Sequence, residues 1–302
     1  MAESPTTFPL PAHCLVEFES GSDDALIAFA VGPDRAVYAL HAFGAYAHGR
    51  PPPAYRVRAW LDGQCVLDTR IDDEPHMLYA LQPLGADLLF ASVPPGKPVG
   101  AANGKVYSRE GRRLRELVLG DSIEHLQTTR KGAIWTAYFD EGVFGDDPVS
   151  AHGLAAWDAS GECTYRFHPD LAGLDYICDC YALNVADDRE TWLYYYNQFP
   201  LVLVRERRVS RYWKVPVAGA RAFAVRGEHA LFTGGYGQFD TLTLLRLGEN
   251  AHCDVLARFR PCDEDGEALS ADRFHGRADT LYFHAAGGIW AVGLDEALAA
   301  SS

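Results

Sequence analysis

The sequence predicts an all-β fold, a six-bladed β-propeller of four-stranded antiparallel blades, on three observations. A unit of short strands and Gly or Asp turns recurs about every fifty residues along the 302-residue chain. Its strands alternate apolar and polar residues and are rich in β-branched and aromatic side chains. The clearest copy joins Gly132–Phe139 to Gly153–Cys163. Repeats of this kind are typical of propellers, in which each repeat forms one blade, so we expect residues 1–302 to form a single domain.

Each repeat divides into strands a, b, c and d, of which a is innermost. The repeats start near residues 24, 76, 121, 178, 221 and 270. In the first repeat we expect strands at 25–31, 36–40, 55–60 and 65–69. The later strands are expected at 87–91, 105–108 and 114–118, then 132–139 and 153–157, then 191–196 and 201–204, then 230–232, 241–245 and 253–257, and finally 280–283 and 289–292.

The sixth repeat has no d strand of its own, and the N-terminus supplies a candidate. Ala12-His13-Cys14 is similar to Ala251-His252-Cys253, which opens the d strand of the fifth repeat. We therefore expect residues 13–19 to complete the last blade and residues 1–12 to be a flexible N-terminus. Such closure removes exposed sheet edges, which invite aggregation.

The charge of the chain limits its partners. The sequence has 27 basic and 41 acidic residues, a formal net charge of −14. Binding to a nucleic acid or to an anionic membrane surface needs a basic face, so neither is expected. A basic protein or a small neutral or cationic ligand fits this charge better.

Targeting and cysteine patterns predict a cytoplasmic protein. The first residues show no signal-peptide pattern, and no run of about eighteen apolar residues predicts a membrane span. The seven cysteines are mostly isolated, as is usual for reduced thiols. Cys14, Cys65, Cys163 and Cys253 hold equivalent positions on d strands, and we expect them to be buried packing residues.

The connections from strand d to the next strand a are acidic in five of six cases, and the sixth carries Arg221. In propellers these connections lie at one mouth of the central channel, where ligands usually bind. Three interpretations stay open: ordinary Asp turns, attraction of a basic partner, or a divalent-metal site. The candidate binding residues here are Asp24, His76, Asp121, Glu124, Asp179 and Asp272, of which Glu124, Asp179 and Asp272 are weak metal-ligand candidates.

The connections from strand b to strand c reach the same mouth and are long and rich in glycine. Loops of this length in a compact fold are often functional. One of them pairs carboxylates with an aromatic residue, at Asp140, Glu141 and Phe144. Two similar loops contribute aromatic, amide and acidic groups suited to a protein or a sugar, at Tyr196, Gln198, Tyr236 and Asp240.

Gly132-Ala-Ile-Trp135, followed by Gly153-Leu-Ala-Ala-Trp157-Asp158, resembles the repeats of bacterial two-component-regulator and lactonase-like propellers. The resemblance implies the propeller architecture. For lactonase-like proteins it also implies a divalent ion held on the channel by a Glu, an Asn and an Asp. Glu124, Asn184 and Asp272 are the nearest counterparts, although none lies in a family motif.

Two functions remain open. The leading hypothesis is a non-catalytic binding propeller without a cofactor, whose acidic mouth recognises a basic protein, as an immunity or inhibitor protein that masks a basic toxin would. The alternative is a metal-dependent hydrolase or lyase that acts on a small sugar or lactone with one Ca²⁺ or Mn²⁺ in the channel. No catalytic residue is assigned, since the sequence has no Gly-x-Ser-x-Gly elbow and no P-loop.

Overall fold

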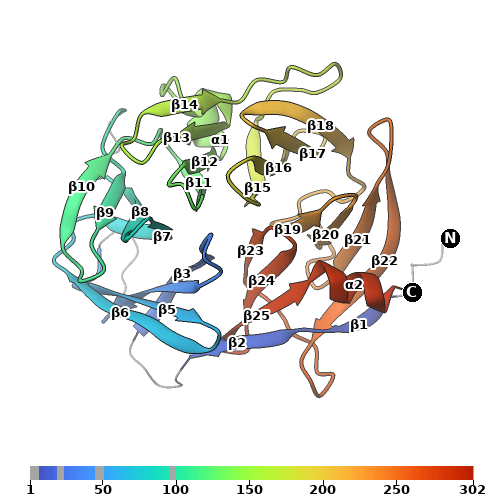
Figure 1. The fold of residues 1–302 in the computed structure, drawn as a ribbon, viewed down its shortest axis with the longest axis horizontal. Coiled ribbons are helices and arrows are strands. Elements are labelled where there is room, and N and C mark those ends of the chain that lie inside the picture. Colours follow the sequence, from blue (N-terminus) through green and yellow to red (C-terminus); the bar gives the residue numbers. More distant parts are fainter. Residues whose placement is uncertain (1–6, 19–23, 45–50, 95–98, 302) are drawn as a thin grey trace. The chain divides into compact units, whose positions relative to one another are not determined.

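The computed structural model describes residues 7–18, 24–44, 51–94 and 99–301. Its fold is a β-propeller of six antiparallel blades, as the sequence predicts (Figure 1). The chain divides into two compact units. Blades 1 to 3 and the first two residues of blade 4 belong to the first unit, residues 19–168 and 176–180, and the rest of blades 4 to 6 belongs to the second unit, residues 1–18, 169–175 and 181–302.

Within the first unit, each blade pairs four consecutive strands in order. The long loop between the second and third strands of blade 3 carries the helix α1 (Asp140–Val143) and the 3-10 turn η1 (Ser150–His152). The strands are β3 (Asp24–Val31), β4 (Val37–Phe43), β5 (Ala54–Leu61) and β6 (Gln64–Asp72) in blade 1, β7 (Met77–Leu84), β8 (Asp87–Val93), β9 (Gly104–Tyr107) and β10 (Arg113–Leu117) in blade 2, and β11 (Ile123–Thr128), β12 (Ile134–Tyr138), β13 (Leu154–Trp157) and β14 (Cys163–Arg166) in blade 3.

The second unit also receives strands from the N-terminus, and it ends in the helix α2 (Leu294–Ala300). Its strands are β15 (Asp179–Val185), β16 (Glu190–Tyr196), β17 (Pro200–Arg205) and β18 (Arg208–Lys214) in blade 4, β19 (Phe223–Arg226), β20 (His229–Thr233), β21 (Leu242–Leu247), β22 (Cys253–Cys262) and β1 (Thr7–Pro11) in blade 5, and β23 (Arg273–Arg277), β24 (Thr280–Ala285), β25 (Gly288–Gly293) and β2 (His13–Glu17) in blade 6. The inner strands start within three residues of the positions expected from the repeat.

The burial of the strands explains their composition. The middle strands are covered on both faces: every residue of β12 and β13 is buried, as is all of β4 except Phe43. Such strands have near-continuous apolar sequences. The outer strands β10 and β14 are largely exposed and carry charged residues. The core of the first unit lies between its blades, where residues such as Leu40, Phe90 and Tyr138 pack.

The N-terminal segment completes two blades of the second unit. β2 pairs antiparallel with β25, as the expected closing strand 13–19 requires, although residue 19 lies outside the described part. Residues 1–12 were expected to be flexible, but residues 7–11 form β1, which pairs parallel with β22 as a fifth strand of blade 5. Leu10 and Ala12 are each 1% exposed, so burial of apolar side chains holds this segment. The prolines of this segment argue against a strand in the sequence. A strand at the edge of a sheet nevertheless tolerates proline.

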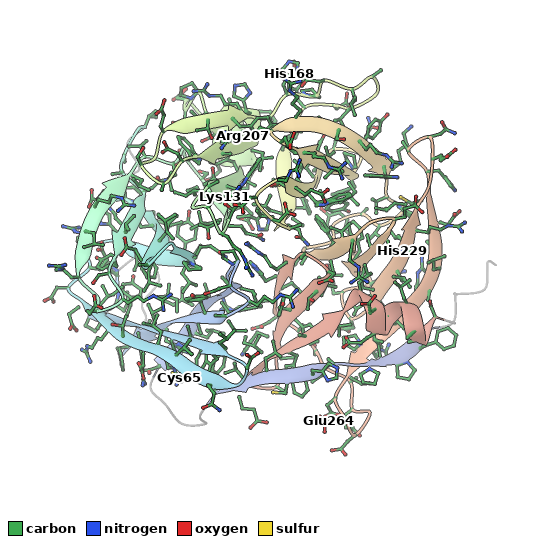
Figure 2. All side chains as sticks on the ribbon, viewed as in Figure 1. Cys65, Lys131, His168, Arg207, His229 and Glu264 are labelled. Atoms are coloured by element: carbon green, nitrogen blue, oxygen red, sulfur yellow. The ribbon has the colours of Figure 1, made fainter. Side chains whose placement is uncertain are left out.

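The cysteines differ from their expected environment. All seven are free. Cys253 is buried, but Cys14 and Cys65 are exposed, the latter on the outer strand β6 (Figure 2). The expectation of burial at all four equivalent positions is therefore wrong, because the outer strands keep one face in solvent. No helix of the described residues is long and apolar enough to cross a membrane.

We predict that Leu10→Ala lowers the free energy of unfolding by about 2–4 kcal/mol, because it leaves a cavity among the buried residues that β1 covers. Phe8→Ala, on the same strand, is the matched control. Phe8 is 48% exposed, so its loss is expected to cost less than about 1 kcal/mol. Urea denaturation followed by circular dichroism measures both. Equal losses would show that β1 does not pack on blade 5 in solution.

Candidate functional site

Several acidic side chains of the d-to-a connections are neutralised or bonded within their own turns. The side chain of Asp24 is buried, and its Oδ2 lies 3.7 Å from Nη1 of the Arg56 guanidinium. In the second unit, Asp272 Oδ1 lies 2.7 Å from His284 Nδ1, and Asp263 accepts hydrogen bonds from two backbone N–H groups of its own turn. The turn interpretation therefore accounts for Asp263, whereas Asp24 and Asp272 are paired with side chains of strands in their own blades. Residues 21–23 of the first connection lie outside the described residues.

His76, a predicted binding residue, contacts a buried carboxylate through its backbone N–H and its side chain. The Glu74 side chain is fully buried and accepts hydrogen bonds from the His76 backbone N–H, at 3.0 Å, and from the Tyr107 hydroxyl. The Nδ1 atom of His76 lies 2.7 Å from the same carboxylate. Burial, reinforced by Glu74, raises the pKa of Tyr107, so its hydroxyl stays a donor. These residues hold the β6–β7 connection rather than a ligand.

Four predicted acidic residues of the first unit form what we call the acidic cluster: Asp121, Glu124, Asp140 and Asp179. Asp121 precedes β11 and Glu124 lies within it, while Asp140 and Asp179 begin α1 and β15. Burial, and then the charges of Asp140 and Glu124, raise the pKa of Asp179 to about 6. These carboxylates therefore repel one another, and no cationic side chain of the described residues forms an ion pair with Glu124, Asp140 or Asp179.

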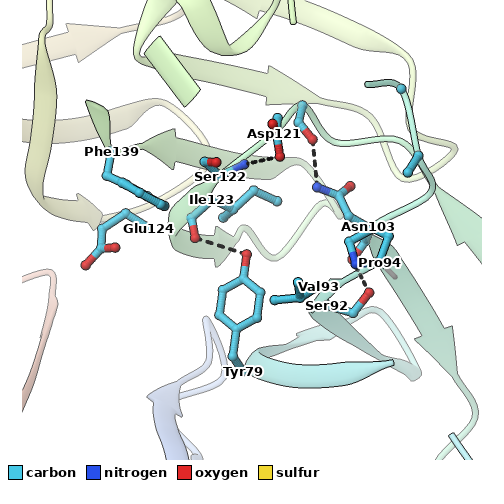
Figure 3. A pocket seen from close by; sticks show the side chains of 13 residues that line it. Tyr79, Ser92, Val93, Pro94, Asn103, Asp121, Ser122, Ile123, Glu124 and Phe139 are labelled. Atoms are coloured by element: carbon cyan, nitrogen blue, oxygen red, sulfur yellow. Dashed lines mark hydrogen bonds between the residues drawn. The ribbon is translucent and has the colours of Figure 1, made fainter. Parts of the chain in front are cut away.

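A pocket of about 260 Å³ adjoins this cluster, between blades 2 and 3 (Figure 3). It lies at the end of the blades where the inner strands start, the end expected to bind ligands. Apolar and aromatic side chains make up much of its wall, and Asp121 and Glu124 are its charged members. The lining residues are Tyr79, Ser92, Val93, Pro94, Gly100, Ala101, Asn103, Gly120, Asp121, Ser122, Ile123, Glu124 and Phe139.

A tight turn before β11 shapes the pocket. Gly120 has a φ of +81°, and a Cβ there would lie 2.5 Å from the Tyr138 hydroxyl and 2.7 Å from Ser150 Oγ, so only glycine fits. The buried Asn103 ties the turn to blade 2: its Nδ2 donates to the Gly120 carbonyl at 2.7 Å, and its Oδ1 accepts from the Leu119 N–H at 3.0 Å. Two blades therefore fix the position of Asp121.

A buried hydrogen-bond chain anchors the same turn to the core of blade 3. The Trp157 indole N–H donates to Thr136 Oγ1 at 2.8 Å, and Thr136 Oγ1 lies 2.6 Å from the Tyr138 hydroxyl. Tyr138 in turn donates to the Leu119 carbonyl at 2.8 Å. These three side chains come from the clearest sequence repeat. The repeat thus supplies the rigid support of the pocket.

Tyr79 joins β7 to the start of β11. Its hydroxyl donates to the Ile123 carbonyl at 3.0 Å. Burial, together with the charges of Glu124 and Asp121, raises the pKa of Tyr79, so the hydroxyl remains protonated. Tyr79 lines the pocket, but its hydroxyl already donates its hydrogen bond to the backbone.

The loop after β12 adds an aromatic residue near Asp140. In the single turn of α1 the Phe144 N–H donates to the Asp140 carbonyl at 2.8 Å. Phe144 is 72% exposed, and Glu141 is exposed as well. The structure thus places the three residues predicted from this loop on one exposed segment, next to the lining residue Phe139.

The other predicted aromatic residues gather in the second unit. The rings of Tyr196 and Tyr236 lie 5.6 Å and 6.1 Å from that of Phe199, and Tyr181 contacts both Phe199 and Tyr236. Tyr196 is 48% exposed and Tyr236 is 58% exposed. The two similar loops therefore do meet, around a phenylalanine that they share.

The polar candidates of these loops contribute less to that aromatic group. Gln198 Nε2 donates to an Asp175 carboxylate oxygen at 2.8 Å, and Asp240 lies in an exposed turn. Arg221, the basic exception among the d-to-a connections, places its guanidinium 5.6 Å from the ring centroid of Phe239.

The metal-ligand candidates lie in different surroundings. Among the described residues, no three His, Cys, Asp or Glu side chains are arranged to hold a metal ion. Asn184 is fully buried: its Nδ2 donates to the carbonyls of Phe223 and Ala278, and its Oδ1 accepts from the Ala278 N–H. Its amide is saturated by the backbone, so it is not a free ligand. Glu124 and Asp179 belong to the first unit, and Asp272 to the second.

Of the residues that line the pocket, the sequence predicted only Asp121 and Glu124 as site residues; those not predicted include Tyr79, Asn103, Ser122 and Phe139. Asn103-Gly104 is a turn signal in the sequence, yet Asn103 is buried and joins two blades. Phe139 carried a signal, since it ends the strongest strand and directly precedes Asp140. These sequence patterns describe residues that are adjacent in the chain. The pocket, in contrast, forms between two blades that are separate in the sequence.

Comparison with known families gives one match. A model described as the YxzG family matches residues 155–292, from β13 to β25. The pocket residues lie before this range. No curated protein matches significantly.

Solved structures confirm the propeller fold. Hsv2 of Kluyveromyces lactis, with its loop 6CD replaced by a Gly-Ser linker, is similar at a TM-score of 0.51 and 8% identity, over 87% of this chain and 75% of that chain. A catalytically inactive virginiamycin B lyase from Staphylococcus aureus, solved with quinupristin, is similar at a TM-score of 0.51 and 11% identity, over 94% of this chain and 98% of that chain. At these identities the similarity shows the fold alone.

We predict that Asp179→Asn stabilises the protein at pH 7.5. The folded state raises the pKa of Asp179 to about 6, so stability is lost as the pH rises through that value. The neutral amide removes this cost, which is about 1 kcal/mol after allowance for solvent screening. At pH 4 the advantage is expected to shrink, because Asp179 is then mostly protonated in the folded state.

Asp158→Asn is the control for this measurement. Hydrogen bonds from Ser160, and then from its own turn, lower the pKa of Asp158, so its substitution is expected to destabilise the protein at pH 7.5. Urea unfolding at pH 4 and pH 7.5 measures all three proteins. A loss of stability in Asp179→Asn at pH 7.5 would contradict the proposed repulsion.

Proposed function

We propose that the protein is a non-catalytic binding propeller whose acidic cluster recognises a basic partner protein. One observation carries the proposal: burial, and then the charges of Asp140 and Glu124, raise the pKa of Asp179, and none of these three carboxylates has an ion-pair partner in the described chain. A folded protein keeps such repulsion where a ligand relieves it. The ligand that relieves it is a cation.

Charge favours a protein partner for this cluster. The formal net charge of −14 attracts a basic protein over a long range, and the unpaired carboxylates give that attraction a fixed target. The exposed Phe144, one helical turn from Asp140, offers an apolar contact at its edge. An inhibitor or immunity protein that masks a basic toxin belongs to this class of binder.

We predict that the triple variant Glu124→Gln, Asp140→Asn and Asp179→Asn binds a fluorescein-labelled hexalysine peptide at least about 10-fold more weakly than the unaltered protein at low salt. Fluorescence anisotropy measures the affinity. The reason is the loss of three negative charges at the proposed contact. The same variant, used as bait in cell extracts of the source organism, is expected to lose any basic protein that the unaltered protein retains.

The control variant removes three exposed carboxylates from the opposite end of the same unit: Asp62→Asn, Glu110→Gln and Glu162→Gln. These residues lie in the turns between the third and fourth strands of blades 1, 2 and 3. Its net charge equals that of the first variant, yet its affinity is expected to change less than about 2-fold. Equal losses of affinity in both variants would contradict the proposal, because they would show that the net charge alone attracts the peptide.

We also predict that peptide binding weakens as the pH falls below about 6. Protonation of Asp179, whose pKa is about 6, removes one charge of the cluster, whereas the lysines of the peptide stay charged. Anisotropy titrations at pH 5 and pH 7.5 measure the effect. In Asp179→Asn the dependence on pH is expected to flatten, and an unchanged dependence would exclude Asp179 as its origin.

A further inference from the structure

We propose that the pocket between blades 2 and 3 receives one basic side chain, a lysine or an arginine, of the partner. This inference rests on the proposed function. The basic side chain that enters the pocket is called the anchor. The anchor's stem lies against the apolar lining, and its charged end pairs with Glu124.

The size of the pocket fits a single long side chain. Its volume of about 260 Å³ is below the roughly 300 Å³ at which pockets for drug-sized molecules begin. Val93, Pro94, Ile123 and Phe139 supply apolar surface. Lysine and arginine combine an apolar stem with a charged end, so they match a pocket with an apolar wall and an acidic edge.

The hydrogen-bonding groups of the lining select the charge of the ligand. The Tyr79 hydroxyl, Ser92 Oγ and both ends of the Asn103 amide are already bonded to backbone groups. The acidic side chains that remain are Asp121 and Glu124. The available groups are therefore mainly acceptors, which suits a ligand rich in N–H donors and disfavours an anion.

Glu124 is the best placed counter-ion of the two. One Asp121 oxygen accepts the Ser122 N–H at 2.8 Å, whereas Glu124 is exposed and has no ion pair within the described chain. Glu124 also acts electrostatically on both Tyr79 in the pocket wall and Asp179 in the cluster. It thus links the pocket to the remaining acidic residues, and a bound cation neutralises the charge that they share.

A bulky residue tests the pocket without removing any charge. Ala101 lines the pocket and is partly exposed, so Ala101→Trp fills it. Ala102 is the next residue, has a similar exposure and does not line the pocket, which makes Ala102→Trp the matched control. Ala101→Trp is expected to weaken hexalysine binding at least about 10-fold, and Ala102→Trp less than about 2-fold. Urea unfolding checks that both variants stay folded.

The outcomes separate this inference from the proposed function. Unchanged affinity in Ala101→Trp, or equal losses in both tryptophan variants, overturns the pocket anchor while the response to the charge variants still supports the acidic cluster. Failure of hexalysine to bind the unaltered protein overturns both.

Further probes identify the anchor. Glu124→Gln is expected to lose affinity for hexalysine, and hexa-arginine assigns the preferred side chain. Acetylation of the lysines is expected to abolish binding, because it removes the charge while keeping the stem. Displacement of hexalysine by spermidine at equal or lower concentration would assign the pocket to free amines and overturn a protein anchor.

Discussion

Burial of the middle strands on both faces is the constraint on which this structure depends. A strand such as β12 has no position for an unsatisfied charge, because all of its residues are buried. Groups that could bind a ligand are therefore confined to strand ends and connections. The acidic cluster follows this rule, since Glu124 and Asp179 lie at strand starts and Asp140 lies in the connection two residues after β12. The rigid core of each blade then fixes the ends of its strands, and with them the binding groups.

The difference between a turn residue and a binding residue is set by what neutralises its charge. Asp24 has Arg56, and Asp263 has the N–H groups of its own turn. Both satisfy their carboxylates locally, at little cost to the fold. Asp179 has acidic neighbours instead, and the fold keeps it where its ionised form is disfavoured. Acidic composition alone therefore overstates the proposed binding surface, which consists of one cluster on one unit.

The sequence predicted the blades well because strand alternation and glycine turns are local properties. The repeat around Trp135 and Trp157 located blade 3, and the similarity between His13-Cys14 and His252-Cys253 located the closing strand β2. Properties that join separate blades were not predictable in this way. In the sequence Asn103 is typical of a turn and Asn184 was a metal-ligand candidate. In the structure the Asn103 amide bonds the connection that leads into blade 3, and the Asn184 amide bonds backbone groups of blades 5 and 6. Recognising such contacts requires three-dimensional proximity.

The N-terminal strands also have a consequence for how the chain folds. Thr7 pairs with Arg258, about 250 residues later, and His13 pairs with Ala291. These contacts have a very high sequence separation, and chains dominated by such contacts fold slowly. During synthesis, β1 and β2 leave the ribosome before β22 and β25, the strands with which they pair, and must wait until these partners have been made. Throughout that interval blades 5 and 6 are absent, so chaperones have an unpaired N-terminal segment to protect.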